Sequence, residues 1–392
     1  MKKIAIVSTH PIQYNAPLFR LLHESGVVKS RVFYTWEQSA RGAKYDPDFG
    51  REIEWNIPLL EGYDYTFVKN IAAEPGSHHF KGMINPSLNE EIEAWSPDAV
   101  LVFGWSYDSH LRCMRHFHGK IPVLFRGDST LLDEQAGFKR ILRRLFLRWI
   151  YSHVDVALYV GRNNKEYFRK HGLREAQLIP APHAIDNTRF AGPDGGYTGQ
   201  AKSWRMSLGI AETDLVLLFA GKLEGKKDPL FLVRLANEIT DARLKLIFVG
   251  NGSMEDTIRQ TTATDSRFRL LEFQNQQLMP VVYRLADIFI LPSRGPGETW
   301  GLGANEAMAS GCAVMLSDKV GGAVDLVRAG QNGLVFPCGD VEEAARFIRR
   351  LLDGTEDLAK MKAASQRIIQ DFSYEKIISA IQKAASWTRK KK

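Results

Sequence analysis

The feature of this sequence that most restricts its fold is a repeated alternation of short apolar runs with amphipathic stretches. The apolar runs of the first half are 3–8, 31–36, 99–103, 121–125 and 154–160, and those of the second half are 214–220, 244–249, 268–273, 288–291 and 313–316. Unbroken apolar runs separated by helical patterns are typical of parallel strands buried on both faces. We therefore predict two α/β domains, each with a Rossmann-like, doubly wound sheet.

Length and composition agree with two domains. The chain has 392 residues, and 44% of them are hydrophobic. A chain of this length is too long for a single hydrophobic core of ordinary size. A polar, glycine-rich run has the composition of a linker, so we predict a first domain over 1–190, a linker over 191–212 and a second domain over 213–373. The last segment, 374–392, has a helical pattern. The stretch 40–86 is rich in aromatic residues, Gly and Pro, and we interpret it as an irregular insertion near a cleft.

Charge and cysteine usage narrow the class of partner and the compartment. No apolar run approaches the ~20 residues that cross a bilayer. The three cysteines have no paired spacing, so neither a disulfide framework nor a zinc site is indicated, and the cytoplasm is the expected compartment. A net charge of +7 favours anionic partners, such as phosphorylated small molecules or a membrane surface. No nucleic-acid partner is expected, because the basic residues are spread along the chain and no nucleic-acid motif occurs.

The segment 288–311 combines a strand, a glycine-rich loop and a helix of small residues. Gly301 and Gly303 leave backbone N–H groups uncovered at the helix N-terminus, which suits a phosphate. Glu306 on the helix can accept hydrogen bonds from both hydroxyls of a ribose, whereas Glu298 on the loop can reach a sugar. Acidic residues at a helix start are also favoured by the helix dipole alone, so solvated charges are the alternative for an isolated pair.

The two glutamates are followed by Gly311 to Ser317, Gly321-Gly322, Asp325 to Val327 and Asn332 to Val335. This pattern closely resembles the nucleotide-sugar signature of the retaining GT-B glycosyltransferases of family 4. The resemblance implies two Rossmann-like domains that face each other across a cleft, and a C-terminal helix that crosses back to the first domain. It also implies that Glu306 holds the donor ribose and that Glu298 lies beside the donor sugar.

Further donor-site candidates lie on loops that follow strands of the second domain. Lys222 and Lys227 occupy the positions of the family's arginine and lysine, and both can neutralise a diphosphate. A solvated basic turn is the alternative, because Lys226 is adjacent and both neighbours cannot be needed. The donor-binding candidates are Glu306, Gly301, Leu302, Gly303, Gly250, Asn251, Gly252, Phe273 and Gln274. The family usually has a glycine shortly after this phenylalanine, so the identity of the base stays open.

Catalytic and acceptor-side candidates complete the predicted site. The catalytic candidates are Glu298, Lys222, Lys227 and His10, although a lone histidine is as often structural. Acceptor-side candidates follow strands of the first domain and are Gln13, Tyr14, Trp105, Ser106, Arg126 and Asp128. No residues have metal-ligand spacing. The resemblance implies a metal-independent transfer that retains anomeric configuration without a protein base, so no cofactor is expected.

The predicted function is sugar transfer from a nucleotide-diphosphate sugar to an acceptor hydroxyl. We expect the acceptor to be a lipid-linked saccharide of bacterial polysaccharide or glycolipid assembly. Two alternatives remain open. One is a nucleotide-sugar epimerase or hydrolase on the same architecture, and the other is a non-catalytic subunit that binds a nucleotide sugar.

The segment 138–151 predicts an amphipathic helix that carries five basic residues. Its apolar positions 138, 142, 145, 146 and 149 form one stripe, flanked by Lys139, Arg140, Arg143, Arg144 and Arg148. Such a helix can lie in an anionic interface, which predicts peripheral association with the inner face of a membrane. In the alternative, the stripe packs on the first-domain sheet and the basic residues form its solvated face.

Overall fold

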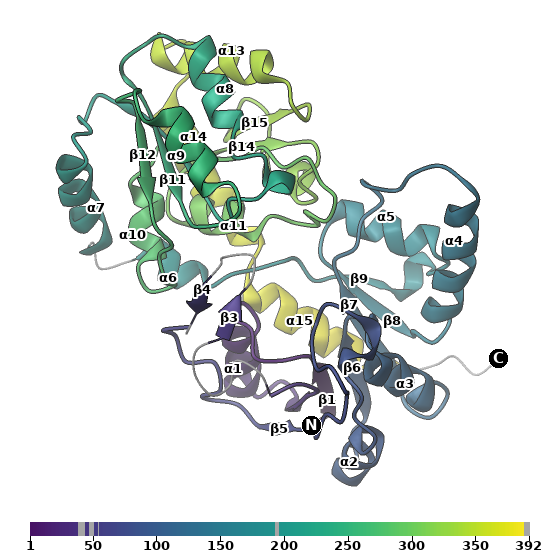
Figure 1. The fold of residues 1–392 in the computed structure, drawn as a ribbon. Coiled ribbons are helices and arrows are strands. Elements are labelled where there is room, and N and C mark those ends of the chain that lie inside the picture. Colours follow the sequence, from purple (N-terminus) through teal and green to yellow (C-terminus); the bar gives the residue numbers. More distant parts are fainter. Residues whose placement is uncertain (38–43, 47–50, 54, 193–195, 388–392) are drawn as a thin grey trace. The chain divides into compact units, whose positions relative to one another are not determined.

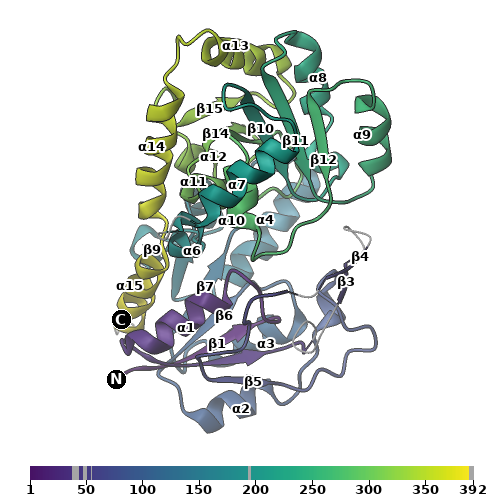
Figure 2. The same ribbon diagram turned by 90° about the vertical axis from the view of Figure 1, so that its left-hand side faces the viewer.

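The structure is a computed structural model that describes residues 1–37, 44–46, 51–53, 55–192 and 196–387. It consists of two compact units. Unit 1 comprises residues 1–44, 57–183 and 374–392, and unit 2 comprises residues 45–56 and 184–373. Each unit is built on its own parallel sheet with helices on both faces (Figure 1, Figure 2).

The sheet of unit 1 has seven strands in the order β5-β2-β1-β6-β7-β8-β9. They are β1 (Lys3–Ser8), β2 (Lys29–Tyr34), β5 (Tyr65–Phe67), β6 (Ala99–Phe103), β7 (Val123–Gly127), β8 (Val156–Tyr159) and β9 (Leu178–Pro180). All neighbouring strands are parallel. The strand order reverses between β1 and β6, where Ile4 pairs with Ala99. Doubly wound sheets bind ligands outside the carboxyl ends of the strands at such a switch point.

Helices bury both faces of this sheet, so the side chains of β1 and β6 have almost no exposed surface. The helices of unit 1 are α1 (Ala16–Ser25), α2 (Leu88–Trp95), α3 (Asp108–Phe117), α4 (Phe138–Tyr151), α5 (Arg162–Lys170) and α15 (Tyr374–Ala385). The last of these, α15, contacts α1, β8 and β9. The Tyr374 hydroxyl donates a hydrogen bond of 2.9 Å to the backbone oxygen of Tyr14. The predicted C-terminal helix therefore returns to the first domain, as expected.

The sheet of unit 2 has six strands in the order β12-β11-β10-β13-β14-β15. They are β10 (Leu215–Ala220), β11 (Leu244–Val249), β12 (Phe268–Leu271), β13 (Ile288–Leu291), β14 (Ala313–Ser317) and β15 (Gly333–Phe336). All of them are parallel, and the switch point lies between β10 and β13. The loops after these two strands carry Lys227 and Glu298, so the topology brings the two predicted residues to one place.

The helices of unit 2 are α6 (Asn187–Ala191), α7 (Gly196–Ser207), α8 (Phe231–Glu238), α9 (Glu255–Thr262), α10 (Met279–Arg284), α11 (Leu302–Ala309), α12 (Ala323–Leu326), α13 (Val341–Leu352) and α14 (Leu358–Ile368). The helix that matters most for the site is α11. Its small residues allow Ala304, Ala307 and Met308 to be completely buried against β13 and β14.

The predicted fold class is confirmed, and the strands of the two large sheets that the sequence did not reveal share one property. β5, β9 and β15 are each three or four residues long, and each lies at an edge of its sheet. An edge strand pairs on one side only and tolerates Pro or Gly, so it does not need the long apolar run of a central strand. β9 ends in Pro180, and β15 begins at Gly333.

The domain boundaries in the structure differ from those predicted. Helix α6 lies in unit 2, and α7 fills much of the predicted linker 191–212 and packs on α10. Glycines in α7 suggested a linker, but tertiary packing overrides their low helix propensity. The predicted insertion 40–86 contains β3 (Lys44–Asp46) and β4 (Arg51–Ile53), which pair with each other, and the edge strand β5. Its remaining residues between 40 and 54 lie outside the described residues.

Candidate functional site

The loop between β13 and α11 has a backbone that only glycine allows at Gly301. This residue caps α11 with a φ of 90°, and a Cβ there would lie 2.8 Å from Val320 Cγ1. Gly303, in the first turn, has Phe289 Cζ 3.2 Å from where its Cβ would be. The N–H groups of Gly301, Leu302 and Gly303 are thus grouped at a helix N-terminus with no Cβ on either glycine, an arrangement suited to an anion.

The turn after β14 holds this loop in place. The N–H of Gly321 donates to the Glu298 backbone oxygen over 2.9 Å, and the N–H of Gly322 donates to Trp300 over 2.9 Å. A Cβ on Gly321 would lie 1.8 Å from the oxygen of Thr299, so the close approach of the two backbones requires glycine. The backbone from Glu298 to Trp300 is therefore held by two glycines that sequence reasoning noted only as part of a pattern.

Glu298 and Lys227 form an ion pair across the two loops of the switch point. Lys227 Nζ lies 2.7 Å from Glu298 Oε2, and the side chains are 20% and 14% exposed. Ser293 Oγ donates to the same carboxylate oxygen over 3.2 Å. The structure thus brings together two of the four predicted catalytic residues, and their partial burial strengthens the interaction relative to a pair in water.

Glu306 lies in the second turn of α11 and is only 3% exposed. The hydroxyl of Tyr283, from α10, donates a 2.6 Å hydrogen bond to Glu306 Oε2. Next to it, Trp300 Nε1 donates to Asn305 Oδ1 over 2.8 Å. The hydrogen bond from Tyr283 and the burial of Glu306 show that this carboxylate is not a solvated charge at a helix start.

The predicted glycines after β11 allow close contact with the lysine loop after β10. A Cβ on Gly250 would lie 2.1 Å from the Gly221 oxygen, and one on Gly252 would lie 2.6 Å from the Leu223 oxygen. Between them, Asn251 accepts a hydrogen bond from the N–H of Leu223 over 3.0 Å. The loop that carries Lys222 is therefore packed directly on the Gly250 to Gly252 turn.

Asn251 also links this turn to the loop after β12. Its Oδ1 accepts a 2.9 Å hydrogen bond from the N–H of Phe273, and its Nδ2 donates to Glu255 Oε2 over 2.8 Å. The amide of Gln274 donates to the Glu272 backbone oxygen over 3.1 Å. The predicted donor-binding residues thus lie on adjoining loops at the carboxyl edge of the unit 2 sheet.

The predicted residues of unit 1 lie at the carboxyl ends of its strands. His10, Gln13 and Tyr14 follow β1, and Trp105 and Ser106 follow β6, so both loops lie beside the switch point of that sheet. The rings of His10 and Trp36 are 5.3 Å apart in an edge-to-face contact.

Arg126, at the end of β7, has its guanidinium turned into unit 1. It donates to the backbone oxygens of Ala181 (2.7 Å) and Pro182 (3.1 Å), and burial lowers the pKa of Arg126 to about 10. The neighbouring Asp128 lies 3.8 Å from His183 Nε2, a residue that the sequence did not single out. Burial lowers the pKa of His183, which favours its neutral form.

Among the described residues, no three His, Cys, Asp or Glu side chains are grouped as a metal site would require. In the same part of the chain, no helix is both long and apolar enough to cross a bilayer.

Helix α4 presents an apolar surface to solvent. Six of its large apolar side chains are between 43% and 72% exposed; we call them the α4 face, and they are Phe138, Ile141, Leu142, Leu145, Phe146 and Trp149. The residues that α4 buries in unit 1 are Leu147, Ile150 and Tyr151. The alternative in which the predicted stripe packs on the sheet is therefore wrong, because a second apolar surface of the helix does so.

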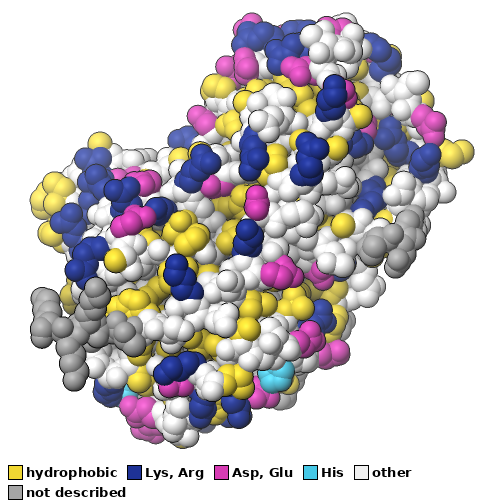
Figure 3. Space-filling model, turned by 180° about the vertical axis from the view of Figure 1, so that it is seen from behind, with side chains coloured by type: hydrophobic (Ala, Val, Ile, Leu, Met, Phe, Trp, Pro, Cys, Tyr) yellow, Lys and Arg dark blue, Asp and Glu magenta, His cyan; other side chains and the backbone are white. Residues whose placement is uncertain are grey.

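Basic residues surround the α4 face. Lys139, Arg143 and Arg148 are exposed, and Arg144 pairs with Glu134 at 2.6 Å. Arg115, from α3, lies over the Trp149 ring at 5.5 Å. Seen from behind, the part of unit 1 that carries α4 shows hydrophobic side chains among Lys and Arg (Figure 3). The surface is therefore both apolar and cationic.

Part of the chain is similar in sequence to known proteins. Residues 200–368 match the family described as Glycosyl transferases group 1. The D-inositol 3-phosphate glycosyltransferase of Rhodococcus erythropolis is 29% identical over 219 residues, which cover 51% of this chain and 49% of that protein. A namesake from Catenulispora acidiphila is 31% identical over 197 residues, covering 47% and 46%. The chain spans about half the length of these relatives.

Solved structures extend the similarity to the whole chain. HepE of Anabaena, in complex with UDP and glucose, aligns with a TM-score of 0.70 at 17% identity, covering 99% of this chain and 100% of that one. The lipopolysaccharide outer core galactosyltransferase WaaB aligns with a TM-score of 0.65 at 15% identity, covering 97% and 99%. The protein therefore has the GT-B fold, and its residues 200–368 match the Glycosyl transferases group 1 family.

Proposed function

We propose that the protein transfers a sugar from a nucleoside-diphosphate sugar to an acceptor hydroxyl, with retention of anomeric configuration. The observation that carries this proposal is the Lys227–Glu298 ion pair beside the glycine-lined N-terminus of α11, the helix that also holds Glu306. Cationic and N–H donors suit a diphosphate, and two fixed carboxylates suit the hydroxyls of a ribose and a sugar. The UDP and glucose bound by HepE support a donor of this class.

In the proposed reaction, the bond between sugar C1 and the diphosphate oxygen breaks while a bond from C1 to the acceptor oxygen forms. The acceptor proton passes to the departing phosphate oxygen on the same face, so no protein base is required. Negative charge grows on the leaving diphosphate. Lys222, Lys227 and the N–H groups at the start of α11 stabilise that charge, and no metal is needed.

A panel of nucleotide sugars tests the donor. Sugars of UDP, GDP, ADP and dTDP are added to the protein, and the melting temperature is measured. A ligand at a hundred times its dissociation constant stabilises the native state by about 2.7 kcal/mol, which is readily seen. If none of these compounds shifts the melting temperature, the proposed donor class is wrong.

Product analysis then separates the proposed reaction from its alternatives. NMR of the product is expected to show the donor's anomeric configuration, and turnover is expected to survive EDTA. Free sugar formed at the full rate without acceptor identifies a hydrolase, an altered sugar in the donor identifies an epimerase, and binding without turnover identifies a non-catalytic subunit. Loss of activity in EDTA with rescue by magnesium or manganese contradicts metal independence.

The acceptor is proposed to be a lipid-linked saccharide reached at the inner face of a membrane. The α4 face supplies apolar side chains, and the basic residues around it complement anionic lipid headgroups, each adding about 1 kcal/mol near the surface. Phe146 and Trp149 stack with ring centroids 5.8 Å apart, and both are exposed. Aromatic side chains of this kind favour the boundary between water and acyl chains.

Flotation with anionic vesicles tests this part of the proposal. Wild-type protein is expected to float at low salt and to lose most of its binding at high salt, because the charges are exposed. Replacing Lys139, Arg140, Arg143 and Arg144 by Gln should abolish flotation. A matched control replaces Lys202, Arg243, Arg259 and Arg346, which are exposed basic residues of unit 2, and should float normally. Equal loss in both variants points to net charge alone, and wild-type protein that never floats points to a soluble acceptor.

A further inference from the structure

The lysine loop ends in a buried carboxylate that the proposed chemistry does not use. Asp228 follows Lys227, is 4% exposed and has a φ of 48°, in the left-handed region. Its Oδ2 accepts hydrogen bonds from Arg234 Nη2 (2.5 Å) and Arg294 Nε (2.7 Å). A buried carboxylate is costly unless it is paired, and this one is paired with two guanidinium groups from different elements.

The two arginines connect Asp228 to both sides of the site. Arg234 lies in α8, so it anchors the carboxylate to a helix. Arg294 lies on the loop after β13, between Ser293 and Glu298, and its N–H donates to the Lys226 backbone oxygen over 2.8 Å. The loop with Glu298 and the loop with Lys227 are thus joined by Asp228 and Arg294.

The same two loops are also joined by the Lys227–Glu298 pair. The two contacts are also linked through the backbone. Asp228 directly follows Lys227, and Arg294 directly follows Ser293, whose hydroxyl donates to Glu298. Lysine has a flexible four-carbon side chain, so a fixed Nζ position requires a fixed backbone. The buried pair supplies that constraint one residue away.

We propose that Asp228 is a positioning residue for the diphosphate site, which through Arg294 and Arg234 holds Lys227 where the leaving diphosphate carries its charge. This inference rests on the proposed function, because the diphosphate is the ligand that Lys227 would meet. Displacement of a charged group by about 1 Å can cost on the order of a hundredfold in rate. Removing the Asp228 charge therefore weakens the site without touching the ligand.

The test uses Asp228→Asn, which keeps the side-chain size and tolerates the left-handed backbone. Titration calorimetry is done with whichever of UDP, GDP, ADP or dTDP wild-type protein binds, and with the corresponding nucleoside. We expect affinity for the diphosphate to fall about tenfold and affinity for the nucleoside to stay within twofold. Asp241→Asn is the matched control, because Asp241 also pairs with an arginine but lies at the other edge of the sheet, and it should change neither affinity.

A double-mutant cycle with Lys227→Ala separates positioning from general destabilisation. If Asp228 acts through Lys227, its replacement has no further effect on diphosphate affinity once Lys227 is removed. Should Asp228→Asn fail to fold, Arg294→Gln carries the same test, since the Arg294 side chain is 52% exposed. Additive losses, or equal losses for nucleoside and diphosphate, overturn the inference. Wild-type protein that binds none of the four diphosphates refutes the proposed function, and this inference with it.

Discussion

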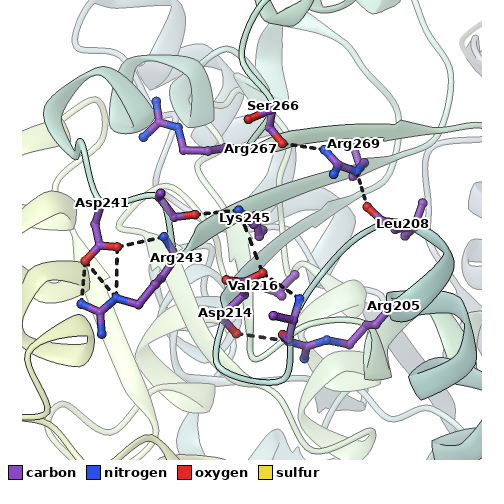
Figure 4. Close-up of polar contacts among 12 residues, drawn as sticks. Arg205, Leu208, Asp214, Val216, Asp241, Arg243, Lys245, Ser266, Arg267 and Arg269 are labelled. Carbon is purple, nitrogen blue, oxygen red and sulfur yellow. Dashed lines mark hydrogen bonds and ion pairs between the residues drawn. The ribbon is translucent and has the colours of Figure 1, made fainter.

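The two edges of the unit 2 sheet hold similar charged residues in different ways. At the amino edge, two arginines pair with aspartates close to them in the sequence: Arg243 contacts Asp241 at 2.6 Å (Figure 4), and Arg267 contacts Asp265 at 2.7 Å. Both pairs are two residues apart in sequence. At the carboxyl edge, Lys227 and Glu298 are 71 residues apart, and Asp228 and Arg294 are 66 apart.

We expect the amino-edge contacts to serve stability and the carboxyl-edge pairs to serve the proposed donor site. Arg269 at the amino edge donates to the backbone oxygens of Leu208 and Ser266, each at 2.7 Å (Figure 4). It thus satisfies backbone acceptors in the segments that precede β10 and β12. The pairs at the carboxyl edge instead join loops that are far apart in the sequence, and they lie at the proposed donor site. Replacements at the carboxyl edge should therefore alter binding and turnover, and those at the amino edge should alter stability alone.

The largest expected difference concerns lysine. Lys227→Ala should lower turnover by about 10²–10³-fold, because the charge that Lys227 neutralises grows as the donor bond breaks. Lys245→Ala, at the amino edge, removes a residue that donates to the Ala242 oxygen at 2.6 Å and should leave turnover within twofold. Initial rates at saturating donor, normalised to folded protein, measure both. Comparable turnover in the two variants would erase the distinction between the edges.

The second-largest effect is expected for a substitution of Glu306. Glu306→Gln keeps the size of the side chain and an acceptor for Tyr283, but it loses charge-assisted bonds to the ribose, worth roughly 1.5–3 kcal/mol. Donor affinity is expected to drop at least about tenfold. Calorimetry with the bound nucleoside diphosphate and its 2′-deoxy analogue checks the assignment, since only wild-type protein should discriminate strongly between them. Undiminished discrimination in the variant would falsify the ribose role.

A glycine with a left-handed backbone lies near each edge, so alanine substitutions can compare how strongly the two edges contribute to stability. Gly301→Ala and Gly209→Ala both place a Cβ at positive φ, which costs about 1–2 kcal/mol. Around Gly301 the new atom also meets Val320 Cγ1 at 2.8 Å, whereas near Gly209 it meets Arg269 Nη2 at 3.6 Å. Chemical denaturation should show Gly301→Ala less stable than Gly209→Ala by at least about 1 kcal/mol. Equal losses would mean that the carboxyl edge is not the more tightly built of the two.

The smallest effect is expected for Asp241→Asn. The hydrogen bond from Arg243 lowers the pKa of Asp241, so the pair stabilises the native state above the unfolded pKa and is lost as the pH falls below about 4. Because the pair is exposed, its replacement should cost less than about 1 kcal/mol at pH 7 and less again at pH 2, where the native carboxylate becomes protonated. Urea denaturation at the two pH values measures this. A larger loss at pH 2 than at pH 7 would reverse the expected sign.

The sequence alone predicts the location of residues whose place in the fold follows from the order of strands and helices. Glu298 and Glu306 lie after a strand at a switch point, so alternation of strands and helices places them at the carboxyl edge. Tyr283, Asp228 and Arg294 were missed, because their partners are 23 to 66 residues away and no periodicity connects them. Contacts of that kind depend on how loops pack, which a single sequence does not reveal.

Helix α4 shows the same limit in another form. Its periodicity predicted an apolar stripe, but the helix also has Leu147, Ile150 and Tyr151 on a second surface. A helix with two apolar surfaces has a core side that periodicity alone does not identify. In the structure, Leu147, Ile150 and Tyr151 are buried in unit 1, and the α4 face is exposed to solvent.

The return of α15 to unit 1 has a consequence for synthesis on the ribosome. Unit 1 contains both β1 and α15, so its core is completed only after residues 374–385 have emerged. Until then, the surface of α1, β8 and β9 that contacts Ile377 and its neighbours in α15 is open to solvent. Nearly all of unit 2 lies between these segments and can fold while unit 1 is incomplete. Unit 2 can therefore be completed before unit 1, and the apolar surface that awaits α15 is the part of unit 1 exposed to aggregation during synthesis.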